Sequence, residues 1–449
     1  MHFALLPIGL GYLASYLKSQ IADAQLFFID CAKQQFGHEA FAKELARIKP
    51  DVLGITAFTL EIESAIQCCD IAKSFDKNLI TVIGGVHVTC VPEEVLSHPN
   101  VDFVFRGEAE KSFCQFIKEL MEGEEDFSKI PNLGFKQDGK MSFNPIEVIK
   151  DIDELPFPDY ELLRFQEYPK TYKMKYFPSA PLITSRGCPF PCTYCAAGKI
   201  SGKEFRSRSP ENIIREIQYI KEKYKIREFE IWDDNFTLNK ERTHRFCDLL
   251  LKEKINLPWW CPNGLRIETL DEELIRKMKA SGLYAIAVGV ESGSEKIQKD
   301  MKKNLKFDKI REIVALGNKY GIRMEGFFIL GYPTETRDDI LKTIQFSKEL
   351  PLKRASILLF QPLVGSEIHD TLARQGKLNG IDARKVEYSK PSILPEGIDS
   401  LEELKQLQKK AIFEFYLRPT VFFTFLIENL SWDQIKDLWG MVKKYILGK

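Results

Sequence analysis

Three cysteines lie close together near the middle of the chain, at positions 188, 192 and 195. Their spacing, Cys-x3-Cys-x2-Cys, places three thiolates on one short loop, where they can ligate three corners of a cubane iron–sulfur cluster. Gly187 and the small residues at 196–198 let the backbone pass close to a bulky group. Two prolines inside the loop stiffen it and remove two backbone donors. The pattern therefore indicates metal or redox chemistry at this loop.

Two other uses of these thiols are weaker alternatives. A structural zinc site takes four ligands in a closed arrangement, and the next Cys or His along the chain is His244. A disulfide would leave one of the three thiols without a partner. Three ligands on a four-iron cluster instead leave one iron open, so that a small molecule can bind there.

The cysteine loop follows the first of six apolar segments that alternate with helical patterns. The strands are expected at 181–187, 227–234, 259–266, 284–292, 323–331 and 354–362. A helix follows each of the first five; for instance, Ser209 and Pro210 are typical of a helix start. One helix after each strand predicts a partial or full parallel β/α barrel over residues 181–375.

Polar or small residues follow each of these strands. Besides the cysteine loop, they are residues 233–235, 263–266, 291–293, 331–336 and 361–363. In a β/α barrel the carboxyl ends of all strands meet at one rim, where active sites form. Any one of these segments is ordinary as a polar loop, but all of them together with a cysteine cluster predict an active site.

Residues 1–122 are expected to form a separate, doubly wound α/β domain. Short apolar strands are expected at 24–30, 51–58, 79–85 and 101–107, with helical patterns at 61–74 and 110–121. Buried strands separated by helices predict a parallel sheet covered on both faces, and such sheets bind ligands at the carboxyl ends of their strands. The domain opens on a helical segment, 7–18, so we expect either that its first strand is missing or that the start codon lies further upstream.

Two further segments complete the expected organisation. Residues 123–180 contain a hairpin pattern and a Pro-containing acidic stretch, which predict a linker between the domains. Residues 376–449 are expected to form a helical C-terminal segment, with amphipathic helices at 400–417 and 431–449. The second helix predicts either packing on the barrel or contact with a membrane surface or a greasy substrate.

Length, charge and cysteine usage bound the class of protein. A chain of 449 residues favours two or three domains. Lys and Arg number 64, as do Asp and Glu, and this balance argues against a nucleic-acid-binding surface over the whole protein. No apolar run approaches the roughly 18 residues that span a membrane, and no basic residues precede the apolar start as in a signal peptide. Reduced thiols in a cytoplasmic protein are therefore expected.

The sequence around the cysteines resembles a known superfamily. Arg186-Gly187-Cys188, followed by Cys192-Thr193-Tyr194-Cys195, is similar to the signature of radical S-adenosylmethionine (SAM) enzymes. The segments IWDDNFT, GLRIETLDEELIRKMKASG, AVGVESGSEKI and FFILGYPTET extend the resemblance. With GGVHVT, VDFVFRGEAEKSF and DIDELPFPDY, they resemble the subfamily that joins a radical SAM barrel to an N-terminal cobalamin-binding domain. That subfamily includes class B methyltransferases and the anaerobic magnesium-protoporphyrin monomethyl ester cyclase.

The resemblance implies one 4Fe-4S cluster on the three cysteines, with SAM chelating the open iron through its amino and carboxylate groups. Reductive cleavage of SAM then gives a 5′-deoxyadenosyl radical that takes hydrogen from an unreactive carbon, while the barrel excludes water. Residues at the strand ends are implied to contact SAM, with a second, polar group near them. The first set is Tyr194, Glu291, Ser292 and Gly331, and the second is Asp233, Asp234, Asn235 and Arg266. Only Cys247 and Cys261 follow the motif, so no auxiliary cluster is expected.

Cobalamin binding is implied by the resemblance of the first domain. Gly84, Gly85 and Thr89 would line the site of the nucleotide tail of cobalamin. Many such domains carry a D-x-H-x-x-G motif whose His ligates cobalt, but this sequence lacks the motif, and His87 is a poor candidate for that role. Relatives in the subfamily can also lack it and leave the lower cobalt face without a protein ligand.

Three functions are compatible with these features. The first is a cobalamin-dependent radical SAM enzyme that methylates an unactivated carbon of a small-molecule or lipid-like substrate, with flavodoxin or ferredoxin as electron donor under anaerobic conditions. The second is a radical SAM enzyme that forms a ring or a C–C bond and uses cobalamin differently or not at all. The third is a non-catalytic iron–sulfur protein for electron transfer or sensing, which the SAM-site segments disfavour.

Overall fold

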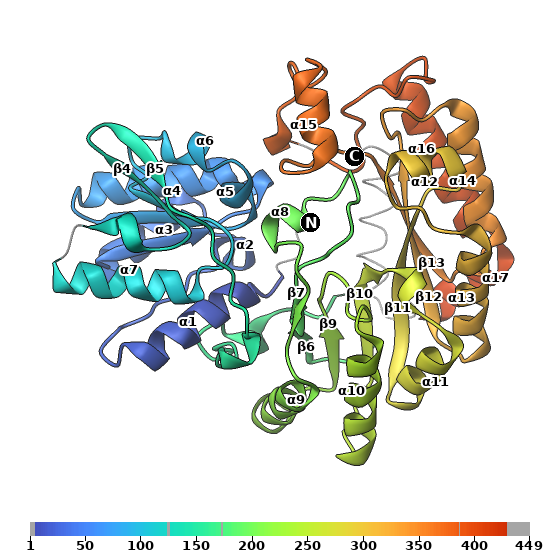
Figure 1. Cartoon of the computed structure of the whole chain (residues 1–449), viewed down its shortest axis with the longest axis horizontal. Coiled ribbons are helices and arrows are strands. Elements are labelled where there is room, and N and C mark those ends of the chain that lie inside the picture. The colour runs from blue at the N-terminus through green and yellow to red at the C-terminus, as the bar shows by residue number, and fades with distance from the viewer. Residues whose placement is uncertain (1–4, 124–125, 172–173, 386, 429–449) are drawn as a thin grey trace.

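The computed structural model describes residues 5–123, 126–171, 174–385 and 387–428, which form two α/β units side by side (Figure 1). The smaller, N-terminal unit is blue to cyan in the figure, and the larger unit runs from green to red. The hairpin that carries the cysteines lies between them. No helix within these residues is long and apolar enough to cross a membrane.

The N-terminal sheet has the strand order β1-β2-β3-β4-β5. Its first three strands are parallel, as the sequence predicts: β1 (Val52–Thr56), β2 (Ile80–Gly84) and β3 (Phe103–Phe105). Successive residues of one strand face opposite sides, since Val82 belongs to one apolar cluster and Ile83 to another. Helices cover both faces: α1 (Ile8–Gln20), α2 (Cys31–Gln34), α3 (His38–Ile48), α4 (Ile62–Phe75), α5 (Val86–Cys90), α6 (Pro92–Leu96) and α7 (Glu110–Glu122).

The predicted hairpin extends this sheet. β4 (Leu133–Gln137) and β5 (Lys140–Phe143) are antiparallel, and β4 pairs with the edge strand β3. The turn residues Asp138 and Gly139 both have positive φ, as a two-residue hairpin turn requires. Residues 133–143 therefore belong to the first sheet, whereas the sequence assigned them to the linker 123–180. Pairing with an open sheet edge depends on a distant strand, which local turn signals do not reveal.

The strand predicted at 24–30 is wrong, because this segment has no strand pairing in the structure. Its apolar side chains pack against three different apolar clusters instead: Leu26 beside α1 and α7, Phe28 on the barrel core, and Ile29 beside α3 and α4. The apolar side chains of this segment therefore fill spaces beside the N-terminal helices and the barrel core. An extended segment and a strand bury similar side chains, and only a neighbouring strand with free backbone groups distinguishes them.

The larger unit contains a parallel six-stranded sheet with the order β13-β12-β11-β10-β9-β6. Its strands are β6 (Ser179–Leu182), β9 (Glu228–Ile231), β10 (Trp259–Leu265), β11 (Leu283–Glu291), β12 (Arg323–Leu330) and β13 (Arg354–Leu359). The two edge strands, β6 and β13, do not pair with each other in the described part of the chain. The predicted partial β/α barrel is therefore confirmed.

One helix follows each strand and covers the outer face of the arc (Figure 1). These helices are α9 (Pro210–Tyr224), α10 (Lys240–Lys252), α11 (Glu272–Ala280), α13 (Phe307–Lys319) and α14 (Arg337–Glu349), with short helices α12 (Glu295–Asp300) and α15 (Glu367–Arg374) near the rim. Ser209 caps α9 by accepting a hydrogen bond from the backbone of Asn212, as predicted. α16 (Leu401–Tyr416) packs against β13 and α14, and α17 (Pro419–Glu428) follows it. The helix predicted at 431–449 lies outside the described residues.

Candidate active site at the cysteine rim

The cysteine loop is closed at its base by a two-stranded hairpin. β7 (Ser185–Arg186) pairs antiparallel with β8 (Arg206–Ser207), and Cys188 N donates to Gly202 O at 3.1 Å. Gly187 has φ +87°, and a Cβ there would lie 2.0 Å from Glu204 O. Only glycine fits this position.

The strand predicted at 181–187 is divided between β6 and β7, because Asp233 binds Thr184 and Ser185 and the chain leaves the main sheet there. Buried Asp233, just after β9, accepts hydrogen bonds from Thr184 N (2.6 Å) and Ser185 Oγ (2.6 Å). These bonds replace ladder bonds after Leu182, so the chain leaves the barrel and forms β7. Asp233 thus holds the base of the cysteine hairpin and is not free to bind SAM.

The three cysteines of the loop are free thiols. Cys188 and Cys192 are half-buried and Cys195 is exposed. Desolvation by the surrounding loop, and then the neighbouring Cys192, raise the pKa of the Cys195 thiol to about 11. Thiolates rather than thiols bind iron, so cluster assembly must displace protons here.

Arg266, which follows β10, contacts the cysteine loop. Its contact with SAM stays a prediction. Its guanidinium stacks on the ring of Phe190 at 3.9 Å, and its Nη1 lies 3.9 Å from Cys192 Sγ. Nε donates to Glu268 and Nη2 donates to Lys303 O. These contacts hold the guanidinium in place beside the cysteine loop.

Within the described residues, no three His, Cys, Asp or Glu side chains converge on the position of a single metal ion. A cubane makes a different demand, since each of its irons takes one thiolate. The donor set of three thiols on one loop, closed by Gly187 and flanked by a guanidinium, fits that demand.

Tyr194 and Glu291 meet beside the loop, and a lysine that the sequence does not single out joins them. Lys303 Nζ lies 3.1 Å from Glu291 Oε1 and 3.3 Å from the Tyr194 hydroxyl. Glu291 and Lys303 are both buried. A Cβ at Gly289 would lie 2.4 Å from Glu291 Oε1, so this glycine leaves the room that the carboxylate occupies.

Sequence reasoning had no signal for Lys303, because its neighbour Lys302 is the same residue type in the same loop. Lys302 pairs with exposed Glu367 at 2.7 Å, whereas Lys303 points inward to Glu291. Only the tertiary structure separates the two lysines.

Two predicted SAM residues, Ser292 and Gly331, have their polar groups engaged elsewhere. The Ser292 hydroxyl is fully buried and lies 3.1 Å from Thr343 Oγ1 on α14. Gly331 N donates to buried Glu335 Oε2 at 2.5 Å, and a Cβ at Gly331 would lie 2.7 Å from Leu404 of α16. The Ser292 hydroxyl and the Gly331 N–H are therefore bonded to Thr343 and Glu335 rather than to the Tyr194–Glu291 pair.

The other two residues after β9 differ in exposure. Asp234 is accessible yet surrounded by protein atoms near Cys188 and Cys195; this desolvation, and then Asp233, raise the pKa of its carboxyl. Asn235 is buried, and neither its amide oxygen nor its amide nitrogen has a hydrogen-bond partner in the described residues.

In the N-terminal unit, the predicted residues form the turn after β2. Gly85 has φ +104°, and a Cβ there would lie 2.8 Å from Ala57 O. Thr89 Oγ1 donates to Gly85 O (2.9 Å) and accepts from Gly107 N (2.8 Å). Gly84 ends β2 in ordinary contact, with no close approach around it. This turn is thus built by its own hydrogen bonds.

His87 is buried, with Nδ1 3.2 Å from Thr59 Oγ1, and its Nε2 has no hydrogen-bond partner in the described residues. Beside it, at the carboxyl end of β1, Phe58 and Leu60 are 61% and 54% exposed. Exposed apolar side chains at the carboxyl ends of parallel strands are typical of a ligand-binding edge. α5 of this turn packs against α8 (Ala197–Ile200), the helix that directly follows Cys195.

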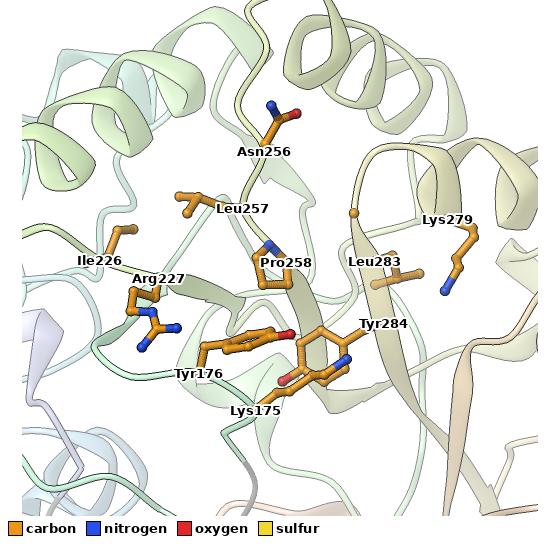
Figure 2. Close-up of a pocket in the computed structure, with 11 residues that line it drawn as sticks. Lys175, Tyr176, Ile226, Arg227, Asn256, Leu257, Pro258, Lys279, Leu283 and Tyr284 are labelled. Atoms are coloured by element: carbon orange, nitrogen blue, oxygen red, sulfur yellow. The ribbon is translucent and has the colours of Figure 1, made fainter.

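A cavity of about 510 Å³ lies at the opposite end of the barrel, by the amino ends of β9, β10 and β11 (Figure 2). Lys175, Arg227 and Lys279 line it, and the Lys175 ammonium lies 5.5 Å from the ring centroids of both Tyr176 and Tyr284. None of the described cysteines of the motif lines this cavity. It is separate from the cysteine rim, and in β/α barrels this end serves stability.

Two family models match the chain. The Radical SAM superfamily model matches residues 182–347, and the B12 binding domain model matches residues 2–117. The first covers the barrel from β6 to α14, and the second covers the N-terminal unit up to α7.

Relatives and solved structures agree with these matches. An uncharacterised methyltransferase of Pyrococcus horikoshii is 32% identical over 98% of this chain and 94% of its own length. The anaerobic magnesium-protoporphyrin IX monomethyl ester cyclase of Rubrivivax gelatinosus is 25% identical over 98% of this chain and 78% of its own length. The structure of the cobalamin-dependent S-adenosylmethionine radical enzyme OxsB, with aqua-cobalamin and S-adenosylmethionine bound, has a TM-score of 0.75 at 16% identity and covers 98% of this chain and 68% of OxsB.

The cysteine rim on a partial barrel, the preceding α/β unit and these matches agree. The chain belongs to the radical SAM superfamily, in the group of enzymes whose barrel follows a B12-binding domain.

Proposed function

We propose that this enzyme transfers a methyl group to an unactivated carbon of a small molecule, with a 4Fe-4S cluster, SAM and cobalamin as cofactors. The observation that carries the proposal is the packing of α5 against α8. It puts the turn after β2, where doubly wound domains bind ligands, beside the loop that would hold the cluster. Cobalamin bound at that turn would lie between the N-terminal unit and the SAM site.

The residues at the rim divide the work. When bound, the cluster and SAM supply a carbon radical, and cobalamin supplies a carrier for the methyl group. Cys188, Cys192 and Cys195 would hold the cluster, and Arg266 lies beside Cys192. Glu291 offers a buried carboxylate oxygen to SAM, and Lys303 orients that carboxylate.

The cobalamin site is proposed around the carboxyl ends of β1 and β2. Gly84, Gly85 and Thr89 shape the turn, and exposed Phe58 and Leu60 offer apolar surface to a large planar ligand. His87 is not proposed as a cobalt ligand, because its side chain is buried within the protein.

The cyclase-type reaction stays as a second candidate, because one relative is a cyclase and shares the same two units. A lipid-like substrate, membrane contact through 431–449, a cytoplasmic location and flavodoxin or ferredoxin as electron donor also remain predictions. So do the outer domain boundaries at 180/181 and 375/376.

Anaerobic purification followed by iron, sulfide and cobalt counts tests the proposal, with a chemical reductant and SAM added afterwards. We expect about four irons per chain and stoichiometric cobalamin after loading. Methylated product with S-adenosylhomocysteine would support methyl transfer, and 5′-deoxyadenosine without methylated product would favour the cyclase-type reaction. A cluster without cobalamin, even after loading, would contradict the cobalamin part.

A further inference from the structure

Four largely buried charged residues join the N-terminal unit to the base of the cysteine hairpin. They are Glu108 and Glu110, after β3, and Arg186 and Arg206, on β7 and β8; we call them the buried ion-pair cluster. Arg186 Nη2 lies 2.6 Å from Glu110 Oε1, and its Nη1 lies 3.4 Å from Glu108 Oε2. Arg206 donates to both oxygens of Glu108, at 2.6 and 2.9 Å. The side chains are only 4% to 13% exposed.

Arg206 and Glu108 also bind backbone groups from two other segments. Arg206 Nη1 donates to Ile149 O (2.6 Å), and Arg206 Nη2 donates to Ser201 O (2.9 Å). Ile149 N donates in turn to Glu108 Oε2 at 3.0 Å. One guanidinium thus ties the N-terminal unit, the segment before the barrel and the end of the cysteine loop.

The same contacts continue into the proposed cobalamin turn. Gly107, next to Glu108, donates its backbone N–H to Thr89 Oγ1 at 2.8 Å. On the other side, Arg186 is separated from Cys188 by Gly187 alone. Each step between Thr89 and Cys188 is therefore a hydrogen bond, an ion pair or a peptide bond.

Burial makes these ion pairs demanding. Removing charges from water is costly, and the attraction between them offsets that cost only where the geometry is good and further hydrogen bonds are made. Arg206 meets both conditions, because its planar fork binds one carboxylate with two hydrogen bonds. Glu110 Oε2 is buried without a hydrogen-bond partner in the described residues, so Glu110 depends on Arg186. Such a cluster tolerates one relative placement of the two units and penalises others.

We propose that Glu108, Glu110, Arg186 and Arg206 are positioning residues that hold the cysteine hairpin at a fixed place against the N-terminal unit. The inference rests on the proposed function for the identity of the cofactors and on the ion pairs alone for the placement. Its consequence would be a fixed separation between the cluster and cobalamin.

The first test uses the full chain with its cluster and without cobalamin. Arg186→Gln and Glu110→Gln each remove one charge, and hydrogen–deuterium exchange is followed in peptides covering 185–207. We expect exchange about tenfold faster in both variants, because an uncompensated buried charge favours local opening. Glu154→Gln is the matched control. It breaks an exposed ion pair with Lys111, which lies in α7 as Glu110 does, and it should leave this exchange unchanged.

The second test uses protein loaded with cobalamin in the Co(II) state and a reduced cluster. Relaxation of the cobalt electron-spin signal by the nearby cluster reports their separation, with the Cys188/Cys192/Cys195→Ala variant as the cluster-free reference. We expect the enhancement to weaken in Arg186→Gln and Glu110→Gln and to persist in Glu154→Gln. Arg186→Lys keeps the charge without the two-pronged contact, should give an intermediate value, and replaces Arg186→Gln if that variant does not fold.

Unchanged exchange at 185–207 in both Arg186→Gln and Glu110→Gln would overturn the inference. So would faster exchange with an unaltered cobalt signal, because the hairpin would then have loosened without losing its place. If the wild-type protein binds no cobalamin, the proposed function fails in that part, and the exchange measurement still decides whether the hairpin is held.

Discussion

At the cysteine rim of the barrel, Lys303 and Glu291 are buried as a pair, whereas at the opposite end Lys175, Arg227 and Lys279 surround an open cavity and form no ion pair in the described residues. Both ends offer charge and space. At the rim, Lys303 and Glu291 orient each other beside the cysteine loop. At the other end the cations are accessible to water, which screens them.

The deeper carboxylate at that end also serves the fold. Glu228 is buried and accepts hydrogen bonds from the backbone N–H groups of Lys175 (3.0 Å) and Tyr176 (2.8 Å). It therefore anchors the chain just before β6. The comparison teaches that a sizeable cavity of a barrel need not mark its chemistry, and that oriented, desolvated charge is the better sign.

Among variants at the two ends of the barrel, removal of the three motif thiols should have the largest effect. Replacing Cys188, Cys192 and Cys195 together by Ala should abolish iron and sulfide binding, because no other described group of three ligands replaces them. Iron and sulfide analysis after anaerobic reconstitution measures this. Cys31→Ala, at a half-buried cysteine of the N-terminal unit, is the control and should keep the full iron content.

Glu291→Gln should have the next largest effect at the rim. The change removes a charge-assisted hydrogen bond and leaves the Lys303 ammonium buried, so SAM should bind about 10- to 100-fold more weakly. Equilibrium dialysis with labelled SAM under anaerobic conditions measures the affinity. Ser292→Ala should change it by less than about twofold, because that hydroxyl bonds to Thr343. An equal loss of SAM affinity in Glu291→Gln and Ser292→Ala would contradict a specific role of the Glu291–Lys303 pair in SAM binding.

Glu228 predicts a pH dependence at the opposite end. Burial, and then the charge of Glu230, raise the pKa of Glu228 from 4.5 to about 7. Because the folded pKa is above the unfolded one, the contribution of Glu228 to stability is complete below about pH 4.5 and is lost as the pH rises through 7. This change amounts to about 3 kcal/mol.

Thermal unfolding of the wild-type protein and of Glu228→Gln between pH 4.5 and 8 tests this. The stability of the wild type relative to the variant should decrease across this range. A constant difference would contradict the raised pKa.

Arg227→Gln should have the smallest effect. This exposed side chain lies 5.6 Å from the Tyr176 ring and forms no ion pair in the described residues, so stability should change by less than about 0.5 kcal/mol. Iron content and SAM affinity should match those of the wild type. A loss of SAM binding in this variant would break the distinction between the two ends.

Much of the scaffold could be predicted from local pattern. Apolar strands separated by amphipathic helices gave the parallel sheets, and turn residues such as Asp138 and Gly139 gave the hairpin. The errors fall where a distant group decides. The segment 24–30 has strand-like residues but no neighbouring strand, and the strand predicted at 181–187 is interrupted by the carboxylate of Asp233.

The site divides in the same way. Thiol chemistry depends on residue type and short spacing, so the sequence by itself predicted the cluster ligands. It also determined the alternation of strands and helices and the shared rim. The tertiary structure alone decided that Lys303 turns inward while Lys302 turns outward, that Ser292 bonds to α14, and that Arg186 and Arg206 meet two glutamates of the other unit. The physical reason is that local pattern fixes which groups lie on an element, whereas burial and partners depend on elements distant in sequence.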